Sequence, residues 1–245
     1  MSGNQGVWPG FQGSRLWRLL RNVGFLRNGL YLTMEIQRTL SEGKANSAVA
    51  VDQEFIAGRD PWKYETNPLE QARFALQTDM LDRVRCGASF ANGLEIGCAE
   101  GIYTEVLAQR CKSLLVLDVS PTALARTQGR RDWGGAVKFD EFDLRASPIP
   151  GAFDLIVIAG VLEYFYQPAT IRQIRDKLVL ALSPQGYLLV ETTRANPVVE
   201  NAWWGRRLLR GKWINAFISE HPLLSQISSN VTPAYAISLF QRVGS

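Results

Sequence analysis

The chain has 245 residues, of which 46% are hydrophobic and 20% are charged. A chain of this length and composition can bury a sizeable core, which excludes disordered, collagen-like and coiled-coil proteins. Six of the 27 basic and two of the 23 acidic residues lie in residues 1–50, so the net charge of +4 belongs to that segment. The neutral remainder lacks the basic surface that grips phosphates, and we therefore expect no nucleic-acid partner.

Cysteine and histidine are sparse in this sequence. Cys86, Cys98 and Cys111 form no CxxC pair, and His221, the single histidine, precedes Pro222 and is expected in a turn. No apolar run reaches the roughly 18 residues of a membrane span, and residues 1–30 lack the pattern of a signal peptide. These features predict no metal, no disulfide framework, no stable membrane anchoring and a cytoplasmic location.

The first fifty residues differ from the rest of the chain. Residues 1–13 are glycine-rich and predict a loose arm, whereas leucines and arginines from Ser14 onward segregate onto two sides of a basic amphipathic helix. This helix has three interpretations: a lid over an acceptor pocket, a weakly lipid-binding surface or a packing appendage. Residues 41–53 are small and polar and indicate a linker. We therefore divide the chain into an N-terminal arm with a helix, 1–53, and a second domain, 54–245.

The second domain begins with turn-forming and aromatic residues and a helix predicted over Pro68–Arg85. After it, strand-like runs alternate with helical patterns, which predicts a parallel sheet wrapped by helices. The predicted strands are 93–96, 113–117, 136–142, 153–159 and 186–192, the predicted helices are 101–110, 121–130 and 169–182, and 223–229 and 234–242 form a terminal hairpin. The expected fold is thus Rossmann-like, doubly wound α/β, with a mostly parallel seven-stranded sheet, a C-terminal antiparallel hairpin and an N-terminal helical lid.

The first predicted strand ends in the turn LEIGCAEG, residues 94–101, which leads directly into a helix. Its glycines allow a tight turn and the close approach of a ligand. The dinucleotide fingerprint GxGxxG would need glycine at Ala99 and Ile102, so NAD and FAD are disfavoured. Asp118 ends the second strand, where a carboxylate can accept both hydroxyls of a ribose, while Ser120 is expected to cap the next helix. The pattern predicts a nucleoside ligand without a pyrophosphate.

The third predicted strand ends in Phe142-Asp143-Leu144. Asp143 can accept a hydrogen bond from an exocyclic amine, and the apolar neighbours can sandwich a purine. A simple turn-forming role for Asp143 is the alternative. Together with Asp118, this segment indicates adenosine.

In this order, the acidic glycine-rich turn, Asp118, Asp143 and the run FDLIVIA at 153–159 resemble class I S-adenosylmethionine-dependent methyltransferases. The resemblance covers about residues 90–242, including LSPQGYLLVE at 182–191, although this family often has glycine where Ala99 stands. It implies S-adenosyl-L-methionine as the cofactor and no metal. The cofactor-binding residues that it implies are Glu95, Gly97, Cys98, Gly101, Asp118, Val119, Asp143, Leu144 and Gly160.

A narrower resemblance begins upstream, in DPW at 60–62 and NPLEQAR at 67–73. These residues look like the segment before the glycine turn in NodS-like methyltransferases, which N-methylate an aminosugar in lipochitooligosaccharide nodulation signals. RCKSLLVLDVSPTALA at 110–125 and FDLIVIAGVLEYF at 153–165 are similar as well. The resemblance implies a lid over the cofactor at 60–73, with Trp62 and Arg73 as cofactor-binding residues and Arg73 meeting the methionyl carboxylate.

Two further groups are candidates for the acceptor side. Glu163 and Tyr164 follow the fourth predicted strand, at the rim where the acceptor meets the methyl group in this family, and either could take a proton from the acceptor. The alternative for Glu163 is an exposed carboxylate at the start of a helix. Basic residues alternate with tryptophans over 203–213, which suits a sugar or an anionic acceptor, or equally an amphipathic helix with snorkelling arginines.

The predicted function is methyl transfer from S-adenosyl-L-methionine to N or O of a small molecule, a sugar or glycosylated natural product being one candidate. We expect residues 14–40 and 203–213 to roof the acceptor pocket. The alternatives are an RNA or protein methyltransferase and a non-catalytic cofactor-binding scaffold. Against a DNA amino-methyltransferase, GVLE at 160–163 follows the fourth strand in place of an (N/D)-P-P-(Y/F) turn.

Overall fold

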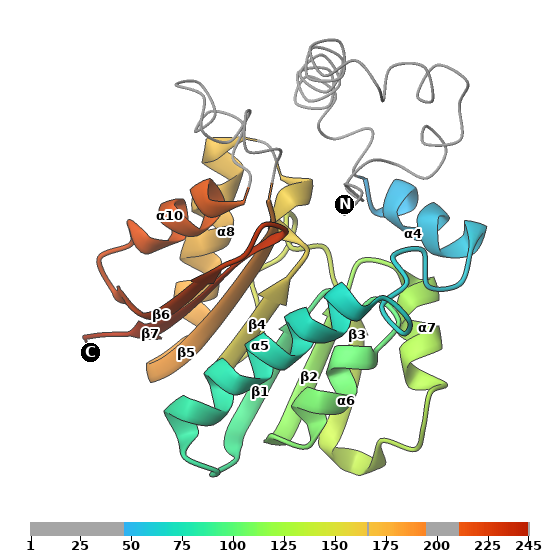
Figure 1. Ribbon diagram of the computed structural model, residues 1–245, viewed down its shortest axis with the longest axis horizontal. Helices are drawn as coiled ribbons and strands as arrows, with labels where there is room; N and C mark the ends of the chain where they lie inside the picture. The colour runs from blue at the N-terminus through green and yellow to red at the C-terminus, as the bar shows by residue number, and fades with distance from the viewer. Residues whose placement is uncertain (1–46, 166, 195–210, 245) are drawn as a thin grey trace.

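The computed structural model describes residues 47–165, 167–194 and 211–244, in which a single sheet is flanked by helices (Figure 1). The strand order is β3-β2-β1-β4-β5-β7-β6. The strands are β1 (Phe90–Ile96), β2 (Cys111–Asp118), β3 (Val137–Glu141), β4 (Phe153–Ala159), β5 (Leu182–Thr193), β6 (Leu224–Val231) and β7 (Tyr235–Arg242). Strands β1 to β5 pair in parallel, whereas β7 runs antiparallel to both β5 and β6.

Helices cover both faces of the sheet, and the alternation of β4 shows how. Its Ile156 and Ile158 join one buried cluster with residues of α8 and α10, whereas Leu155 and Val157 join a second with residues of α5, α6 and α7. The helices are α4 (Ala48–Ala57), α5 (Pro68–Arg85), α6 (Ile102–Ala108), α7 (Pro121–Gln128), α8 (Pro168–Ala181) and α10 (Lys212–Ser219), with 3-10 turns η1 (Gly134–Ala136) and η2 (Leu162–Tyr164). A strand that is buried on both faces reads as a continuous apolar run, as 153–159 does.

The sheet and its hairpin confirm the predicted Rossmann-like fold, and α5 and β4 have the predicted bounds. The linker expected at 41–53 is wrong where the structure describes it, because residues from Ala48 onward form α4. Ser47 caps this helix by accepting a hydrogen bond from the Ala50 N–H. The small residues that suggested a linker therefore include a helix cap and alanines, which favour helix. The predicted domain boundary at residue 53 falls inside α4. The arm and amphipathic helix of 1–46 lie outside the described residues.

The three cysteines and His221 occupy structural positions. Cys86 is the exposed left-handed C-cap of α5, whereas Cys98 and Cys111 are buried. The ring nitrogen Nδ1 of His221 accepts a hydrogen bond from the Leu223 N–H, which confirms its place in a turn. Within the described ranges, no helix is long and apolar enough to cross a membrane.

Helix α4 is fastened to α7 by polar contacts. Asp52 Oδ1 accepts hydrogen bonds from Ser120 Oγ at 2.5 Å and from the Thr122 N–H at 3.0 Å. Burial opposes ionisation of Asp52, but these hydrogen bonds hold its pKa below the usual value. Arg126 of α7 donates to the carbonyls of Phe55 and Gly58 at the other end of α4. Both ends of α4 are therefore anchored on α7.

We expect Asp52→Ala to loosen α4. The Thr122 N–H and the Ser120 hydroxyl lose their acceptor, which costs about 1–2 kcal/mol in the free energy of unfolding. Limited proteolysis should cut the variant faster within residues 48–57, and urea unfolding should report the lost stability. Gln53→Ala, at the exposed neighbouring position, is the control, and equal cutting of the two variants would contradict the anchoring role.

Candidate functional site

The turn between β1 and α6 places backbone in the left-handed region three times. Gly97 has φ +86° and Gly101 has φ +77°, while Ala99 between them has φ +50°. The Gly97 N–H donates to the Leu117 carbonyl at 2.7 Å, which ties the turn to β2. A Cβ on Gly97 would lie 2.3 Å from Val161 Cγ2. Glycine is thus required at Gly97 by conformation and by space, whereas Ala99 carries its side chain at a modest conformational cost.

Asp118 ends β2 beside this turn, and its carboxylate is oriented by backbone. Oδ1 accepts a hydrogen bond from the Ser120 N–H at 2.9 Å, and Oδ2 accepts one from the Ala99 N–H at 3.2 Å. Ser120 Oγ caps α7 by accepting from the Ala123 N–H, as predicted. Burial raises the pKa of Asp118, and the two backbone N–H groups oppose that rise. Hydrogen bonds from the side chain and the backbone of Cys98 oppose the rise as well.

Two other residues of the turn are buried beneath it. Cys98 is 5% exposed and its Sγ accepts a hydrogen bond from Thr127 Oγ1 at 3.5 Å. Burial raises the pKa of Cys98 well above its usual value, which keeps it a thiol. Glu95 is 3% exposed, and burial raises its pKa to about 8, with the Asp118 carboxylate adding to the rise. Glu95 is therefore largely protonated at neutral pH.

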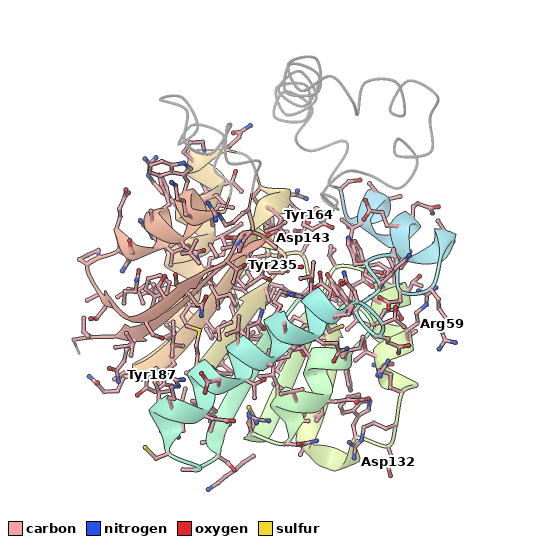
Figure 2. The ribbon with its side chains drawn as sticks, viewed as in Figure 1. Arg59, Asp132, Asp143, Tyr164, Tyr187 and Tyr235 are labelled. Carbon is pink, nitrogen blue, oxygen red and sulfur yellow. The ribbon has the colours of Figure 1, made fainter. Side chains whose placement is uncertain are left out.

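The segment after β3 lies beside Asp118. The Phe142 N–H donates to the Asp118 carbonyl at 2.8 Å, and Asp143 Oδ1 accepts from the Arg145 N–H at 2.8 Å. Asp143 thus has the turn-forming role that was the alternative to ligand binding. Its Oδ2, and a second lone pair on Oδ1, could accept hydrogen bonds from a ligand. Leu144 is buried, and Val119 is half-buried. Figure 2 shows Asp143, which follows β3, and Tyr164, which follows β4, near the carboxyl ends of these strands.

Residues 58–67 pack against the turn as a loop rich in aromatic contacts. Trp62 stacks on Tyr64 with ring centroids 5.8 Å apart and meets the edge of Phe55 at 5.2 Å. The Asp60 N–H donates to Glu100 Oε1 at 2.9 Å, and Glu100 belongs to the β1–α6 turn. Arg126 Nη1 donates to the same Glu100 oxygen at 2.8 Å. The loop that carries Trp62 is thereby linked to the glycine turn.

Arg73 lies on the buried face of α5 and is 4% exposed. Its Nε donates to Glu70 Oε2 at 2.8 Å and its Nη1 donates to Glu191 Oε2 at 2.7 Å. Tyr235 donates its hydroxyl proton to the other Glu70 oxygen. Burial alone would lower the pKa of Arg73, but Glu191 and Glu70 raise it. Arg73 therefore stays charged and joins α5 to β5, and its implied contact with a methionyl carboxylate stays a prediction.

Gly160, directly after β4, has few close neighbours among the described residues. A Cβ on Gly160, whose φ is +69°, would meet no atom of the described residues closer than the Tyr64 hydroxyl at 3.9 Å. Glu163 follows in η2 and is 8% exposed, so its alternative as an exposed helix-start carboxylate is wrong. Its Oε1 accepts a hydrogen bond from the Thr193 N–H at 3.2 Å. Tyr164 is half-buried next to it.

Sequence reasoning missed four residues of this region, namely Glu70, Tyr64, Glu191 and Tyr235. The signals available were the i, i+3 spacing of Glu70 and Arg73 and a glutamate at the end of the apolar strand β5. Of the tryptophan and basic cluster at 203–213, only Lys212 and Trp213 are described; they begin α10, and the Lys212 Nζ lies 5.2 Å from the Trp213 ring centroid. The predicted roof at 14–40 lies outside the described residues.

The strand order, the antiparallel terminal hairpin and the glycine turn with a carboxylate at the end of β2 define the fold of class I methyltransferases. The family Nodulation protein S (NodS) matches residues 45–211, and the chain belongs to this family.

Individual relatives agree with that family. Nodulation protein S of Sinorhizobium fredii (strain NBRC 101917 / NGR234) is 39% identical over 134 residues, which cover 55% of this chain and 61% of the relative. A ubiquinone biosynthesis O-methyltransferase of Pseudomonas aeruginosa (strain LESB58) is 31% identical over 126 residues, covering 50% of this chain and 52% of that protein. The matches thus span about half to six-tenths of the length of these curated relatives.

A solved structure extends the similarity to the whole of its own chain. The crystal structure of N-methyltransferase NodS from Bradyrhizobium japonicum WM9, in complex with S-adenosyl-L-homocysteine, superposes with a TM-score of 0.65 and 27% identity. The match covers 80% of this chain and 98% of that one. An O-methyltransferase family protein from Burkholderia thailandensis, 17% identical with a TM-score of 0.64, shares the fold.

Substitutions at two positions of the glycine turn should differ in their effect on stability. Gly97→Ala adds a Cβ at φ +86° against Val161, and we expect a loss of about 1–3 kcal/mol in the free energy of unfolding. Ala99→Gly relieves a left-handed alanine but frees the unfolded chain, so its stability should change by less than about 1 kcal/mol. Urea denaturation of both variants checks this, and equal losses would refute it.

The raised pKa of Glu95 predicts a specific pH dependence of stability. Between about pH 4.5 and about pH 8 the folded protein keeps the Glu95 proton that the unfolded chain has lost. The free energy of unfolding therefore falls as the pH rises through this window. Glu95→Gln should flatten that fall by on the order of a few kcal/mol, measured by urea unfolding at pH 5 and pH 8.5. Glu141→Gln, exposed on β3, is the control and should keep the pH dependence of the unsubstituted protein.

Proposed function

We propose that this protein is an S-adenosylmethionine-dependent methyltransferase that methylates a nitrogen of a small molecule. The observation that carries the proposal is Asp118, a buried carboxylate held by the Ala99 and Ser120 N–H groups at the end of β2, beside the glycine turn. The related NodS structure was determined with S-adenosyl-L-homocysteine and is called an N-methyltransferase. A cytoplasmic location and the division of the chain at residue 53 stay predictions from the sequence.

The residues present fit this cofactor. Asp118 offers a carboxylate at the end of β2 for ribose hydroxyls, and a Cβ on Gly160 would come no closer than 3.9 Å to any atom of the described residues, so the described residues leave room beside the backbone there. We assign the cofactor site to the residues that the resemblance implied: Trp62, Glu95, Gly97, Cys98, Gly101, Asp118, Val119, Asp143, Leu144 and Gly160. We leave Arg73 out of this set, because it already forms ion pairs with Glu70 and Glu191, and infer that it holds these two carboxylates in place.

The bound cofactor supplies a methyl group on a sulfonium, which is a good leaving group. The work left to the chain is therefore to hold the acceptor in line with that methyl group and to exclude water. The loop at 58–67 is tied to the glycine turn through Glu100 and is suited to cover the cofactor as a lid. Glu163 and Tyr164 lie after β4, on the acceptor side, and are the candidates that would receive a proton from the acceptor.

Titration calorimetry with S-adenosyl-L-homocysteine tests the proposal. Asp118→Asn removes the negative charge while keeping the shape, and we expect the dissociation constant to rise about 10- to 150-fold, which corresponds to about 1.5–3 kcal/mol. Asp140→Asn, at an exposed position of β3, should bind like the unsubstituted protein. Absence of binding to the unsubstituted chain would sink the proposal, and unchanged affinity in Asp118→Asn would move the ribose site elsewhere.

A further inference from the structure

Two buried carboxylates each keep one unpaired oxygen at the carboxyl ends of β4 and β5. Glu163 is 8% exposed and Glu191 is 0% exposed. Glu163 Oε1 accepts from the Thr193 N–H and Glu191 Oε2 accepts from Arg73 Nη1. Within residues 47–165, 167–194 and 211–244, no hydrogen-bond donor reaches Glu163 Oε2 or Glu191 Oε1. Buried polar atoms without partners are rare in native proteins, and the binding of a ligand or an ion is one reason for them.

The two glutamates belong to one electrostatic environment. Thr193, which binds Glu163 through its N–H, lies two residues after Glu191 in β5, and the negative charge of Glu163 adds to the rise in the pKa of Glu191 that burial causes. The other charged or titratable groups that act on the pair are Glu70 and Arg73 of α5, Tyr64 of the preceding loop and Tyr235 of β7. Figure 2 shows Tyr235 and Tyr164 near this end of the sheet.

The negative charges of the buried glutamates exceed the positive charge of Arg73. Glu70 is satisfied, because Arg73 donates to one of its oxygens and Tyr235 to the other. When all are ionised, Glu70, Glu163 and Glu191 carry three negative charges, two more than the positive charge of Arg73 offsets. A buried group of carboxylates with an excess of negative charge is costly unless a proton or a cation joins it. An ammonium brings a positive charge and donors for the unpaired oxygens.

We propose that Glu163 and Glu191 form a carboxylate subsite that binds the ammonium of an amine acceptor and takes up the proton that this nitrogen must lose. Glu163 contacts the nitrogen, and Glu191, held by Arg73, is a positioning residue. This inference rests on the proposed methyl transfer to nitrogen. It adds Glu191, to which the resemblance to known methyltransferases assigned no role, to Glu163 and makes the two carboxylates one binding site.

The proton step balances as follows: R–NH3+ and the Glu163 carboxylate give R–NH2 and the Glu163 carboxylic acid. The electron pair thereby freed on nitrogen forms the new bond to carbon, while the pair of the broken carbon–sulfur bond stays on sulfur. The carboxylic acid then returns its proton to water. Each turnover from an ammonium acceptor thus releases one proton, and the methylated product leaves as a cation.

Carboxyl ¹³C resonances of the full chain, saturated with S-adenosyl-L-homocysteine, test the subsite directly. The probe is methylammonium, with methanol as the uncharged comparison. We expect methylammonium to bind saturably and to shift the carboxyl resonances of Glu163 and Glu191, while methanol does neither.

Two glutamine variants separate the subsite from its surroundings. Glu163→Gln should weaken methylammonium binding at least about tenfold. Glu70→Gln removes one ion pair from Arg73 but leaves both unpaired oxygens in place, so it should weaken binding by less than about threefold. Glu191→Gln is a third variant, but it breaks the ion pair with Arg73, in which both side chains are buried. If this variant fails to fold, Glu163→Gln decides the test.

The outcomes are distinguishable. If methylammonium leaves the pair unperturbed while S-adenosyl-L-homocysteine binds, the subsite is wrong and the cofactor site stands. Equal weakening by Glu163→Gln and Glu70→Gln would also overturn the subsite, since it would reduce the effect to general electrostatics around Arg73. If S-adenosyl-L-homocysteine does not bind, the proposed function fails, and this inference with it.

Discussion

A buried guanidinium is the constraint on which the carboxyl edge of this sheet depends. Arg73 cannot be neutralised under physiological conditions, and an unpaired charge at 4% exposure would cost several kcal/mol. The fold must therefore supply partners for Arg73. Glu70 of α5 and Glu191 of β5 accept hydrogen bonds from it, and Tyr235 of β7 donates to Glu70. The helix before the first strand and the last strands of the sheet are thereby joined at one point.

This junction also fixes the surroundings of the candidate acceptor side. The rings of Tyr64 and Tyr235 lie 5.2 and 5.4 Å from the Arg73 guanidinium carbon, so aromatic faces shield the charge that the carboxylates neutralise. Tyr64 in turn stacks on Trp62 in the loop that contacts the glycine turn. The proposed cofactor side, at Asp118, and the candidate acceptor side, at Arg73, share that loop. A change in one side can consequently reach the other through Trp62 and Tyr64.

Most of the sheet could be predicted because its signals are local. The apolar run of β4 has the observed bounds, and Pro68 and Pro121 begin helices after the caps Asn67 and Ser120. The glycine turn and Asp118 could be placed because each follows a recognisable strand. Helix α4 was missed since its residues resemble a linker, and its stability depends on Ser120, Thr122 and Arg126, about 70 residues away.

The acceptor side was less accessible to sequence reasoning for the same reason. Arg73 and Glu191 are separated by 118 residues, and Glu70 and Tyr235 by 165. No periodicity within α5 or β5 indicates that either pair is in contact. An exposed position was the alternative for Glu163, because the burial of η2 depends on its contact with β5, which lies about 30 residues further along the chain. Short elements such as η2 carry too few residues for a pattern to reveal their buried side.

The three cysteines differ in a way that bears on chemical work with this protein. Burial raises the pKa of Cys111 to about 12 and that of Cys98 well above its usual value, so neither forms the nucleophilic thiolate readily. Cys86 is exposed at the C-cap of α5, and α5 begins at the opposite end, where Arg73 lies. A maleimide or a spin label would consequently attach at Cys86 without any substitution, and it would report on α5 from outside the candidate site.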